Sequence, residues 1–313
     1  GYVSVDGGAT TWVNIPGDAR EHYIPRMEFI PGCNELFIQQ MNRPQNTNKV
    51  WTVKIGETEP NNIFTDTDAA WLETNDNIHW LKNNQYFTWE SERSGYRHLY
   101  RVSRDGKEII PITKGDFDFI REVGMDVKKG LVYFIASPDN FTQRYLYEAK
   151  LFGKGEVKRL SPMDQAGQHS YSMSPTGKWA VHTFSNTETP PVIDMVSFPG
   201  HKSVRLITDN AEAKKQYEAL GLQPKEFFKA RSGELLLDGW MIKPVNFDPN
   251  KKYPVIMHQY SGPGSQQVID RWNIGSRSDN GMFEAYMIDR GFICVCVDGR
   301  GTGGRGAAFE KCT

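Results

Sequence analysis

The chain has 313 residues, with 37 lysines and arginines against 38 aspartates and glutamates, so its formal net charge is -1. This balance gives no electrostatic reason to expect a nucleic-acid partner or an anionic membrane surface. No stretch approaches the roughly 18 consecutive apolar residues that a membrane-spanning helix needs. The four cysteines form no CxxC pair and no cluster with histidine at metal-ligand spacing, so the common zinc motifs are absent.

The first two-thirds of the chain predicts β-strands, because short runs rich in β-branched and aromatic residues alternate with turn signals. Four segments share one order of strand, turn, aromatic-rich strand, polar loop and strand. Their matching positions are Phe37, Phe87, Phe134 and His182, which lie about 48 residues apart. A period of this length with four strands per unit is typical of a β-propeller blade. A β-sandwich is the alternative, but it does not explain the internal similarity.

Residues 1–15 look like the last two strands of a preceding blade. A closed propeller cannot begin in the middle of a blade unless the missing strands come from elsewhere. We therefore expect residues 1–209 to form a partial β-propeller, with about four blades plus part of another, in a chain that begins within a domain.

After residue 209 the sequence no longer continues the repeat of strands and turns. Residues 210–222 predict a short polar helix or linker. The alternating pattern over 224–244 predicts a hairpin with Ser232 and Gly233 in its turn.

The remainder of the chain predicts a βαβ unit. The run YPVIMHQY is apolar on both faces, as in a sheet covered on both sides, and predicts a strand that ends on Tyr260. A helix over about 281–290 follows, with Gly291 as its cap, and then a second doubly buried strand over 292–297. Residues 210–313 are therefore interpreted as a linker and the first part of an α/β domain.

Tyr260 stands at the mouth of a glycine-rich loop, SGPGS, at the carboxyl end of the predicted strand. Ligands bind at this end of the strands in α/β sheets, and glycines let a backbone approach a ligand closely. A phenol aimed at developing negative charge is one of the groups that stabilise an oxyanion. The alternative is that Tyr260 is a strand-end aromatic residue whose hydroxyl bonds to a backbone group.

A second glycine-rich stretch, VDGRGTGGRG, includes the end of the last predicted strand. Gly301, Gly303 and Gly306 match the GxGxxG pattern of dinucleotide-binding folds, but the acidic residue expected about 20 residues later would fall beyond this chain. The alternative is a loop that an ion pair between Asp298 and Arg300 shapes.

No Gly-x-Ser-x-Gly nucleophile elbow, P-loop, HExxH motif or EF-hand loop is present. Cys294 and Cys296 are two positions apart on a predicted strand, so they face one side and are expected to be buried thiols rather than a disulfide. The histidines are interpreted as scattered packing or surface residues. They are His22, His79, His98, His169, His182, His201 and His258.

Three stretches together resemble the dipeptidyl peptidase IV branch of the prolyl oligopeptidase family, and its bacterial members in particular. They are WESERSGYRHLYRV (89–102), KKYPVIMHQYSGPGSQQV (251–268) and VCVDGRGTGGRGAAFEK (295–311). The resemblance implies an eight-bladed propeller packed on an α/β-hydrolase domain. It also implies a serine exopeptidase that releases N-terminal di- or tripeptides, usually after proline, and it implies no cofactor and no metal.

The resemblance gives Tyr260 a role, because this residue matches the tyrosine that stabilises the oxyanion of the tetrahedral intermediate in this family. Trp71, in DAAWLETND (68–76), is our candidate for the aromatic residue that lines the family's cavity, with a packing tryptophan as the alternative. The family's catalytic serine, aspartate and histidine would all follow the last residue here. Its pair of glutamates that holds the substrate's amino terminus would precede the first residue, and we do not assign that role to Glu90 and Glu92.

We therefore expect the chain to be a fragment that lacks the catalytic triad and is itself inactive. By the same resemblance we expect peptide substrates with penultimate proline or alanine, no nucleic-acid partner, a homodimer as one option for the parent protein, and a periplasmic or cell-envelope location in a bacterium. Two alternatives stay open. One is a non-catalytic β-propeller module that binds proteins. The other is a prolyl oligopeptidase-type or acylaminoacyl peptidase with a different substrate length.

Overall fold

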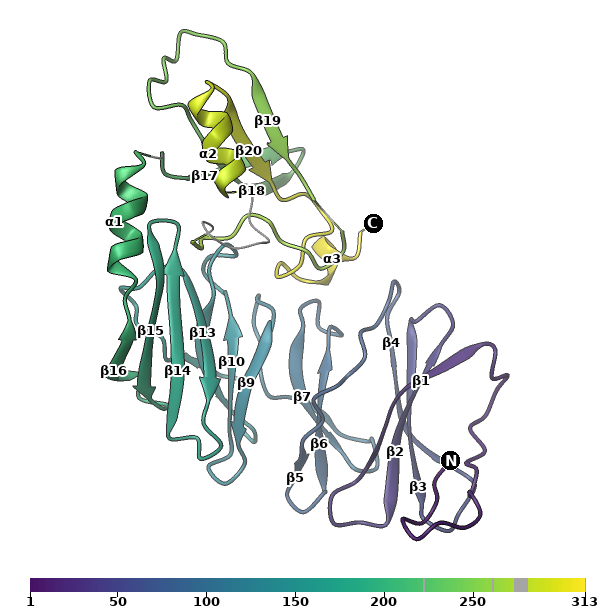
Figure 1. The fold of residues 1–313 in the computed structure, drawn as a ribbon. Helices are drawn as coiled ribbons and strands as arrows, with labels where there is room; N and C mark the ends of the chain where they lie inside the picture. Colours follow the sequence, from purple (N-terminus) through teal and green to yellow (C-terminus); the bar gives the residue numbers. More distant parts are fainter. Residues whose placement is uncertain (222, 261, 273–280, 313) are drawn as a thin grey trace. The chain divides into compact units, whose positions relative to one another are not determined.

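A computed structural model describes residues 1–221, 223–260, 262–272 and 281–312 (Figure 1). The first two-thirds of the chain forms four-stranded antiparallel sheets, each built from four strands that follow one another along the sequence. None of the helices in these residues is long and apolar enough to cross a membrane.

Each sheet keeps the order of its strands in the sequence. The first comprises β1 (His22–Phe29), β2 (Glu35–Asn42), β3 (Thr47–Lys54) and β4 (Asn61–Thr67). The second comprises β5 (Trp80–Leu81), β6 (Tyr86–Ser91), β7 (His98–Ser103) and β8 (Ile109–Pro111). The third comprises β9 (Arg121–Asp126), β10 (Leu131–Ala136), β11 (Tyr145–Lys150) and β12 (Val157–Arg159). The fourth comprises β13 (Gln168–Met173), β14 (Trp179–Asn186), β15 (Thr189–Ser197) and β16 (Lys202–Thr208).

The predicted repeat is confirmed. Phe37, Phe87, Phe134 and His182 lie in β2, β6, β10 and β14, the second strand of each sheet, and none of the four side chains is more than 3% exposed. Large side chains at such positions join one sheet to the next. The rings of Phe37 and Phe87, from the first and second sheets, pack with their centroids 5.3 Å apart. The partial propeller therefore has the four blades that the sequence predicts.

The chain divides into two compact units. One unit comprises Gly1–Lys114 with Gly153–Gly155, and the other comprises Gly115–Phe152 with Glu156–Thr313. The first unit contains the first two sheets, and the second unit contains the third and fourth sheets together with the α/β region. The domain boundary expected after residue 209 stays a prediction.

The N-terminal residues pack on the first sheet. The two strands expected in residues 1–15 are reduced to a single antiparallel bridge between Tyr2 and Thr11. Tyr2, Val13 and Ile15 cover part of the cluster that β2 and β3 form on one face. Burial of these apolar side chains holds a segment that has little regular hydrogen bonding of its own.

The α/β region contains three helices and one mixed sheet among its described residues. The elements are α1 (Ala211–Ala219), β17 (Glu226–Ser232), β18 (Leu235–Ile242), β19 (Val255–His258), α2 (Gly281–Asp289), β20 (Ile293–Val297) and α3 (Ala307–Glu310). The strand order is β17-β18-β20-β19. β17 and β18 form the predicted hairpin, in which Gly233 adopts a φ of 59° that only glycine adopts at no steric cost.

The predicted βαβ unit is also confirmed. β19 and β20 pair in parallel, and α2 lies between them in the sequence. The helix ends as predicted, because Gly291 has a φ of 82° and its N–H donates to the carbonyl of Ile288. Cys294 and Cys296 are buried on one face of β20 and are not bonded to each other, as expected. Burial raises the pKa of the two thiols to about 11 and about 12, respectively.

The expectation that the strand before Tyr260 is buried on both faces is wrong. β19 ends at His258, and Val255 and Met257 are 55% and 62% exposed. Only Ile256 packs toward the core cluster of the region. β19 is the edge strand of the sheet, and in the described part of the chain no element covers the face that carries Val255 and Met257.

The blade core yields a stability prediction with a matched control in the same unit. Phe87→Ala should lower the free energy of unfolding by about 3–5 kcal/mol, because a fully buried ring is lost and a cavity remains. Phe29→Ala should change it by less than about 0.5 kcal/mol, because Phe29 is 61% exposed. Urea denaturation followed by circular dichroism measures both. Equal losses in the two variants would contradict the assignment of Phe87 to the core between blades.

Candidate functional site

Tyr260 lies in the loop that follows β19, two residues beyond the end of the strand, and is 59% exposed. Its ring lies over the backbone of Gly262. A Cβ atom at position 262 would lie 3.0 Å from the Tyr260 hydroxyl oxygen, so a side chain there would crowd the phenol. The absence of a side chain at Gly262 therefore leaves room for the phenol of Tyr260. Position 261 lies outside the described residues.

The loop after Tyr260 is fixed by a buried carboxylate. Asp298 directly follows β20 and is 2% exposed. Its Oδ2 accepts the backbone N–H of Val268 at 2.9 Å, and its Oδ1 accepts that of Gln267 at 3.0 Å. The predicted ion pair between Asp298 and Arg300 is therefore wrong, since Asp298 is oriented toward the backbone of another loop. Charged acceptors make the stronger hydrogen bonds to N–H groups, so this contact joins the residue after β20 to the loop that follows β19.

Opposing effects act on the Asp298 carboxyl. Burial raises its pKa, because the charged form is removed from water, and the neighbouring Asp238 acts in the same direction. The backbone N–H groups of Val268 and Gln267 lower the pKa, as does Arg305. Arg305 also donates to the carbonyl of Leu236, and its guanidinium lies 3.6 Å from the Asp238 carboxylate.

The glycines of the second glycine-rich stretch serve close packing between two loops. The N–H of Gly264 donates to the carbonyl of Gly301, and the N–H of Gly303 donates to the carbonyl of Ser265. A Cβ atom on Gly303 would lie 3.0 Å from the carbonyl oxygen of Gly264, so the two backbones leave no room for a side chain. This contact explains a glycine at position 303 without a nucleotide.

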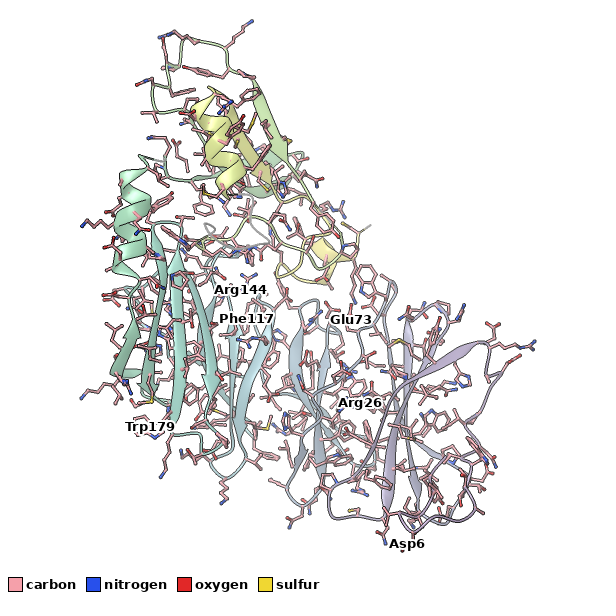
Figure 2. All side chains as sticks on the ribbon, in the orientation of Figure 1. Asp6, Arg26, Glu73, Phe117, Arg144 and Trp179 are labelled. Atoms are coloured by element: carbon pink, nitrogen blue, oxygen red, sulfur yellow. The ribbon has the colours of Figure 1, made fainter. Side chains whose placement is uncertain are left out.

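Arg144, which is labelled in Figure 2, attaches the same loop to the third sheet through a hydrogen bond to Gln266. This partly buried side chain, just before β11, donates to Gln266 Oε1 and to the carbonyls of Phe141 and Gln143, the latter two at 2.8 Å. Gln266 returns a hydrogen bond from Nε2 to the carbonyl of Phe141 at 2.8 Å. Burial lowers the pKa of Arg144 to about 10, so the guanidinium remains charged at neutral pH.

Two further carboxylates join the blades of this unit to the α/β region. Asp118 accepts the backbone N–H of Gly306 at 2.9 Å. Asp270 accepts Nε2 of Gln143 at 2.9 Å and the N–H of Thr187 at 3.0 Å. Sequence analysis missed Arg144, Asp118 and Asp270. They occupy no recognisable motif, and only their contacts with distant segments set them apart.

Trp71 lies in the loop between β4 and β5, in the other compact unit. Its indole Nε1 donates to Glu73 Oε1 at 3.2 Å, and its side chain is partly buried. Trp71 and Tyr260 belong to different compact units. The two predicted roles, cavity lining and oxyanion stabilisation, stay predictions.

Residues 1–191 match the family model described as the dipeptidyl peptidase IV (DPP IV) N-terminal region. The chain is 30% identical to a probable dipeptidyl-aminopeptidase B of Emericella nidulans, over 98% of this chain and 35% of the relative.

Solved structures agree in fold over nearly the whole chain. A crystal structure of Porphyromonas gingivalis dipeptidyl peptidase 4 superposes with a TM-score of 0.83 at 32% identity, covering 96% of this chain and 41% of that one. A putative dipeptidyl aminopeptidase IV from Bacteroides ovatus gives a TM-score of 0.81 at 25% identity, covering 95% and 44%. The chain thus spans less than half the length of each of these relatives.

The buried carboxylate yields a prediction with a defined dependence on pH. Asp298→Asn should destabilise the chain by about 1–3 kcal/mol at neutral pH, because one carboxylate oxygen becomes an NH₂ group and a buried N–H of residues 267–268 loses its acceptor. Burial raises the pKa of Asp298 in the folded chain, so folding favours the protonated carboxyl. The stability gained in this way is fully present below about pH 3.9, the pKa of an aspartate in the unfolded chain. It is lost as the pH rises through the pKa of Asp298 in the folded chain.

The variant lacks this titration, so the stability of the wild-type chain relative to Asp298→Asn should decline from acid toward neutral pH. Urea unfolding at a series of pH values measures the difference. Asp289→Asn, which changes an exposed aspartate, is the control and should show no such trend. A stability difference that grows as the pH rises would contradict the assignment.

Proposed function

The chain belongs to the dipeptidyl peptidase IV family, and from this premise we propose that it is part of a serine exopeptidase. The parent enzyme releases N-terminal di- or tripeptides, typically after proline. Its substrates are peptides with penultimate proline or alanine. The names of the relatives, which are dipeptidyl peptidases and aminopeptidases, support an enzyme rather than a binding module.

The observation that carries the proposal is the placement of Tyr260. Its phenol is exposed, and it stands at the carboxyl end of a parallel strand, where active sites of α/β sheets are built. The loop behind it is held by Asp298 and Gln266, so the phenol belongs to an anchored backbone. A prealigned donor of this kind stabilises an oxyanion with no reorganisation during the reaction.

The reaction then follows the logic of serine hydrolases. A serine attacks the scissile carbonyl, a histidine takes and returns the proton, and an aspartate orients the histidine. Tyr260 donates its hydroxyl hydrogen bond to the carbonyl oxygen as negative charge develops on it, together with a backbone N–H. None of the 313 residues lies in a Gly-x-Ser-x-Gly elbow. These residues alone are therefore proposed to be inactive, with the triad contributed by other parts of the parent protein.

The remaining assignments follow from the same premise. Residues 1–209 form the propeller portion, and 210–313 form the linker and the first part of the peptidase domain. Trp71, whose indole nitrogen is already bonded to Glu73, offers its ring face as a cavity wall for the substrate. The parent protein acts in the periplasm or cell envelope of a bacterium, with a homodimer as its proposed assembly.

Tyr260→Phe in the parent protein tests the proposal. The substitution keeps the ring and removes the hydroxyl, so kcat for Gly-Pro-p-nitroanilide should fall about 10²–10³-fold while KM changes little. Tyr286→Phe is the matched control, because Tyr286 is similarly exposed at 54% and lies on α2. It should leave kcat unchanged. Unchanged turnover in Tyr260→Phe would refute the oxyanion role, and a parent protein that does not react with a fluorophosphonate would refute the serine mechanism.

A further inference from the structure

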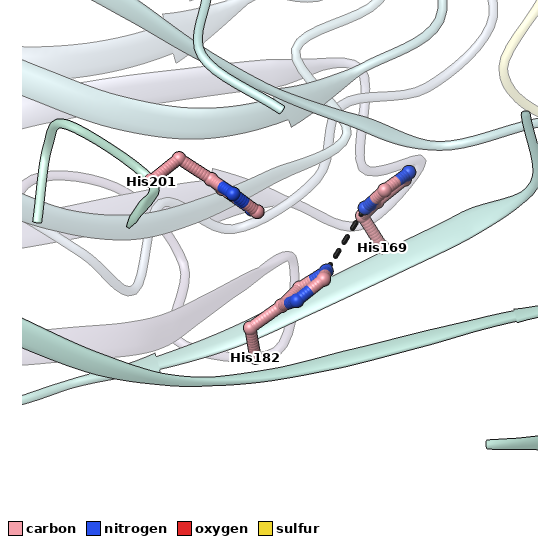
Figure 3. A group of neighbouring side chains, drawn as sticks. All are labelled: His169, His182 and His201. Atoms are coloured by element: carbon pink, nitrogen blue, oxygen red, sulfur yellow. Dashed lines mark hydrogen bonds between the residues drawn. The ribbon is translucent and has the colours of Figure 1, made fainter. Parts of the chain in front are cut away.

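Three histidines converge within the fourth sheet (Figure 3). His169 lies in β13, His182 in β14 and His201 in the turn between β15 and β16. One ring nitrogen from each lies within 4.8 Å of the other two. His169 and His182 are buried, and His201 is partly buried. Three imidazoles on separate strands and turns are therefore gathered at one point inside a blade.

Each of the two buried rings has an acceptor on its outer side. Nε2 of His169 lies 2.9 Å from the carbonyl oxygen of Gln165. Nδ1 of His182 lies 2.9 Å from a carboxylate oxygen of Asp194. A carbonyl and an ionised carboxylate only accept hydrogen bonds, so each ring uses its N–H on this outer side.

The inner nitrogens of the two rings then carry lone pairs that face each other. His169 Nδ1 and His182 Nε2 are 2.9 Å apart, as the dashed line in Figure 3 marks. The two rings make three contacts: His169 with Gln165, His169 with His182, and His182 with Asp194. Each contact needs one hydrogen, but two neutral imidazoles carry only two N–H hydrogens. The arrangement is complete only when a cation, either an extra proton or a metal ion, lies between the inner nitrogens.

We propose that His169, His182 and His201 bind a divalent late first-row transition-metal ion, with Zn²⁺ as the probe. Neutral imidazole nitrogen is a ligand that suits zinc, copper and nickel. Metal-bound histidines characteristically donate their other N–H to a carboxylate or a backbone carbonyl, and Asp194 and Gln165 provide these two partners. A shared proton would involve only His169 and His182, whereas a metal ion would also bind His201.

The spacing requires small movements only. Nitrogen ligands of a tetrahedral zinc ion, at about 2.0–2.1 Å from the metal, lie about 3.3 Å apart. The His169–His182 pair must therefore open slightly, and His201 must turn toward it. His201 is on a turn rather than within a strand. Its Nε2 lies 2.7 Å from the Tyr171 hydroxyl, so metal binding through this nitrogen would replace that hydrogen bond. The Asp194 carboxylate offsets one of the two positive charges of the ion.

An ion at this position would fasten parts of one blade to each other. It would connect β13, β14 and the turn before β16, in addition to the sheet hydrogen bonds and the side-chain hydrogen bond between Tyr171 and His201. His169 also lines a hollow of about 360 Å³. This inference concerns the stability of the blade and is independent of the proposed peptidase chemistry.

The test is a zinc titration of the full chain, freed of any affinity tag and dialysed against chelator. Isothermal titration should find one Zn²⁺ per chain, and the thermal midpoint should rise with zinc concentration, because an ion that binds only the folded state stabilises it. His201→Ala should weaken binding at least tenfold. Asp194→Asn should weaken it about 10–100-fold, since it alters the partner of a metal ligand. Co²⁺ in place of Zn²⁺ should give the intense visible absorption of a four-coordinate site.

His98→Gln is the matched control, because His98 is also buried but lies in the other unit. It should leave zinc affinity unchanged. The double variant His169→Gln/His182→Gln should abolish binding; if it does not fold, His201→Ala and Asp194→Asn still decide the question. Absence of saturable zinc binding would overturn the proposal. If His201→Ala and Asp194→Asn both bound zinc as tightly as the wild-type chain, the proposal would also be overturned.

Discussion

A buried carboxylate holds together the part of the chain on which the proposed chemistry depends. Asp298 directly follows one strand of the parallel pair, and it accepts the backbone N–H groups of Gln267 and Val268 from the loop that follows the other strand. Burying a charge is costly unless its oxygens are satisfied, so the two loops must keep this arrangement for Asp298 to remain buried. Tyr260 begins the loop that is fixed in this way. The position of Tyr260 therefore depends on the hydrogen bonds that Gln267 and Val268, later in the same loop, donate to Asp298.

The same loop is attached to the propeller portion of its unit by polar rather than apolar contacts. Arg144 stays charged, and Gln266 and the carbonyls of Phe141 and Gln143 serve as its acceptors. Apolar packing would tolerate sliding of the loop over the blade, whereas directional hydrogen bonds in a partly buried setting do not. The blade therefore contributes to the position of the loop, although no blade residue is assigned a chemical step in the reaction.

Features that depend on local periodicity could be predicted from the sequence, and features that depend on distant contacts could not. The blade repeat, the hairpin and the βαβ unit follow from residue patterns, whereas the role of Tyr260 rests on the resemblance to a known family and stays a prediction. Asp298 was assigned to its neighbour Arg300, but its partners lie about 30 residues earlier. The exposed face of β19 was missed because an apolar pattern does not say which elements flank a strand. His182 did carry a signal, since the other three blades have phenylalanine at that position.

Amide hydrogen exchange tests most directly the claim that buried hydrogen bonds fix the loop after Tyr260. The N–H groups of Gly264, Gln267, Val268 and Gly303 all donate to acceptors across the two loops. The account predicts that these amides exchange about as slowly as those of β20 in the folded chain. Exchange of Gln267 and Val268 at the rate of an unprotected surface loop would contradict it, because the carboxylate of Asp298 would then not hold the loop.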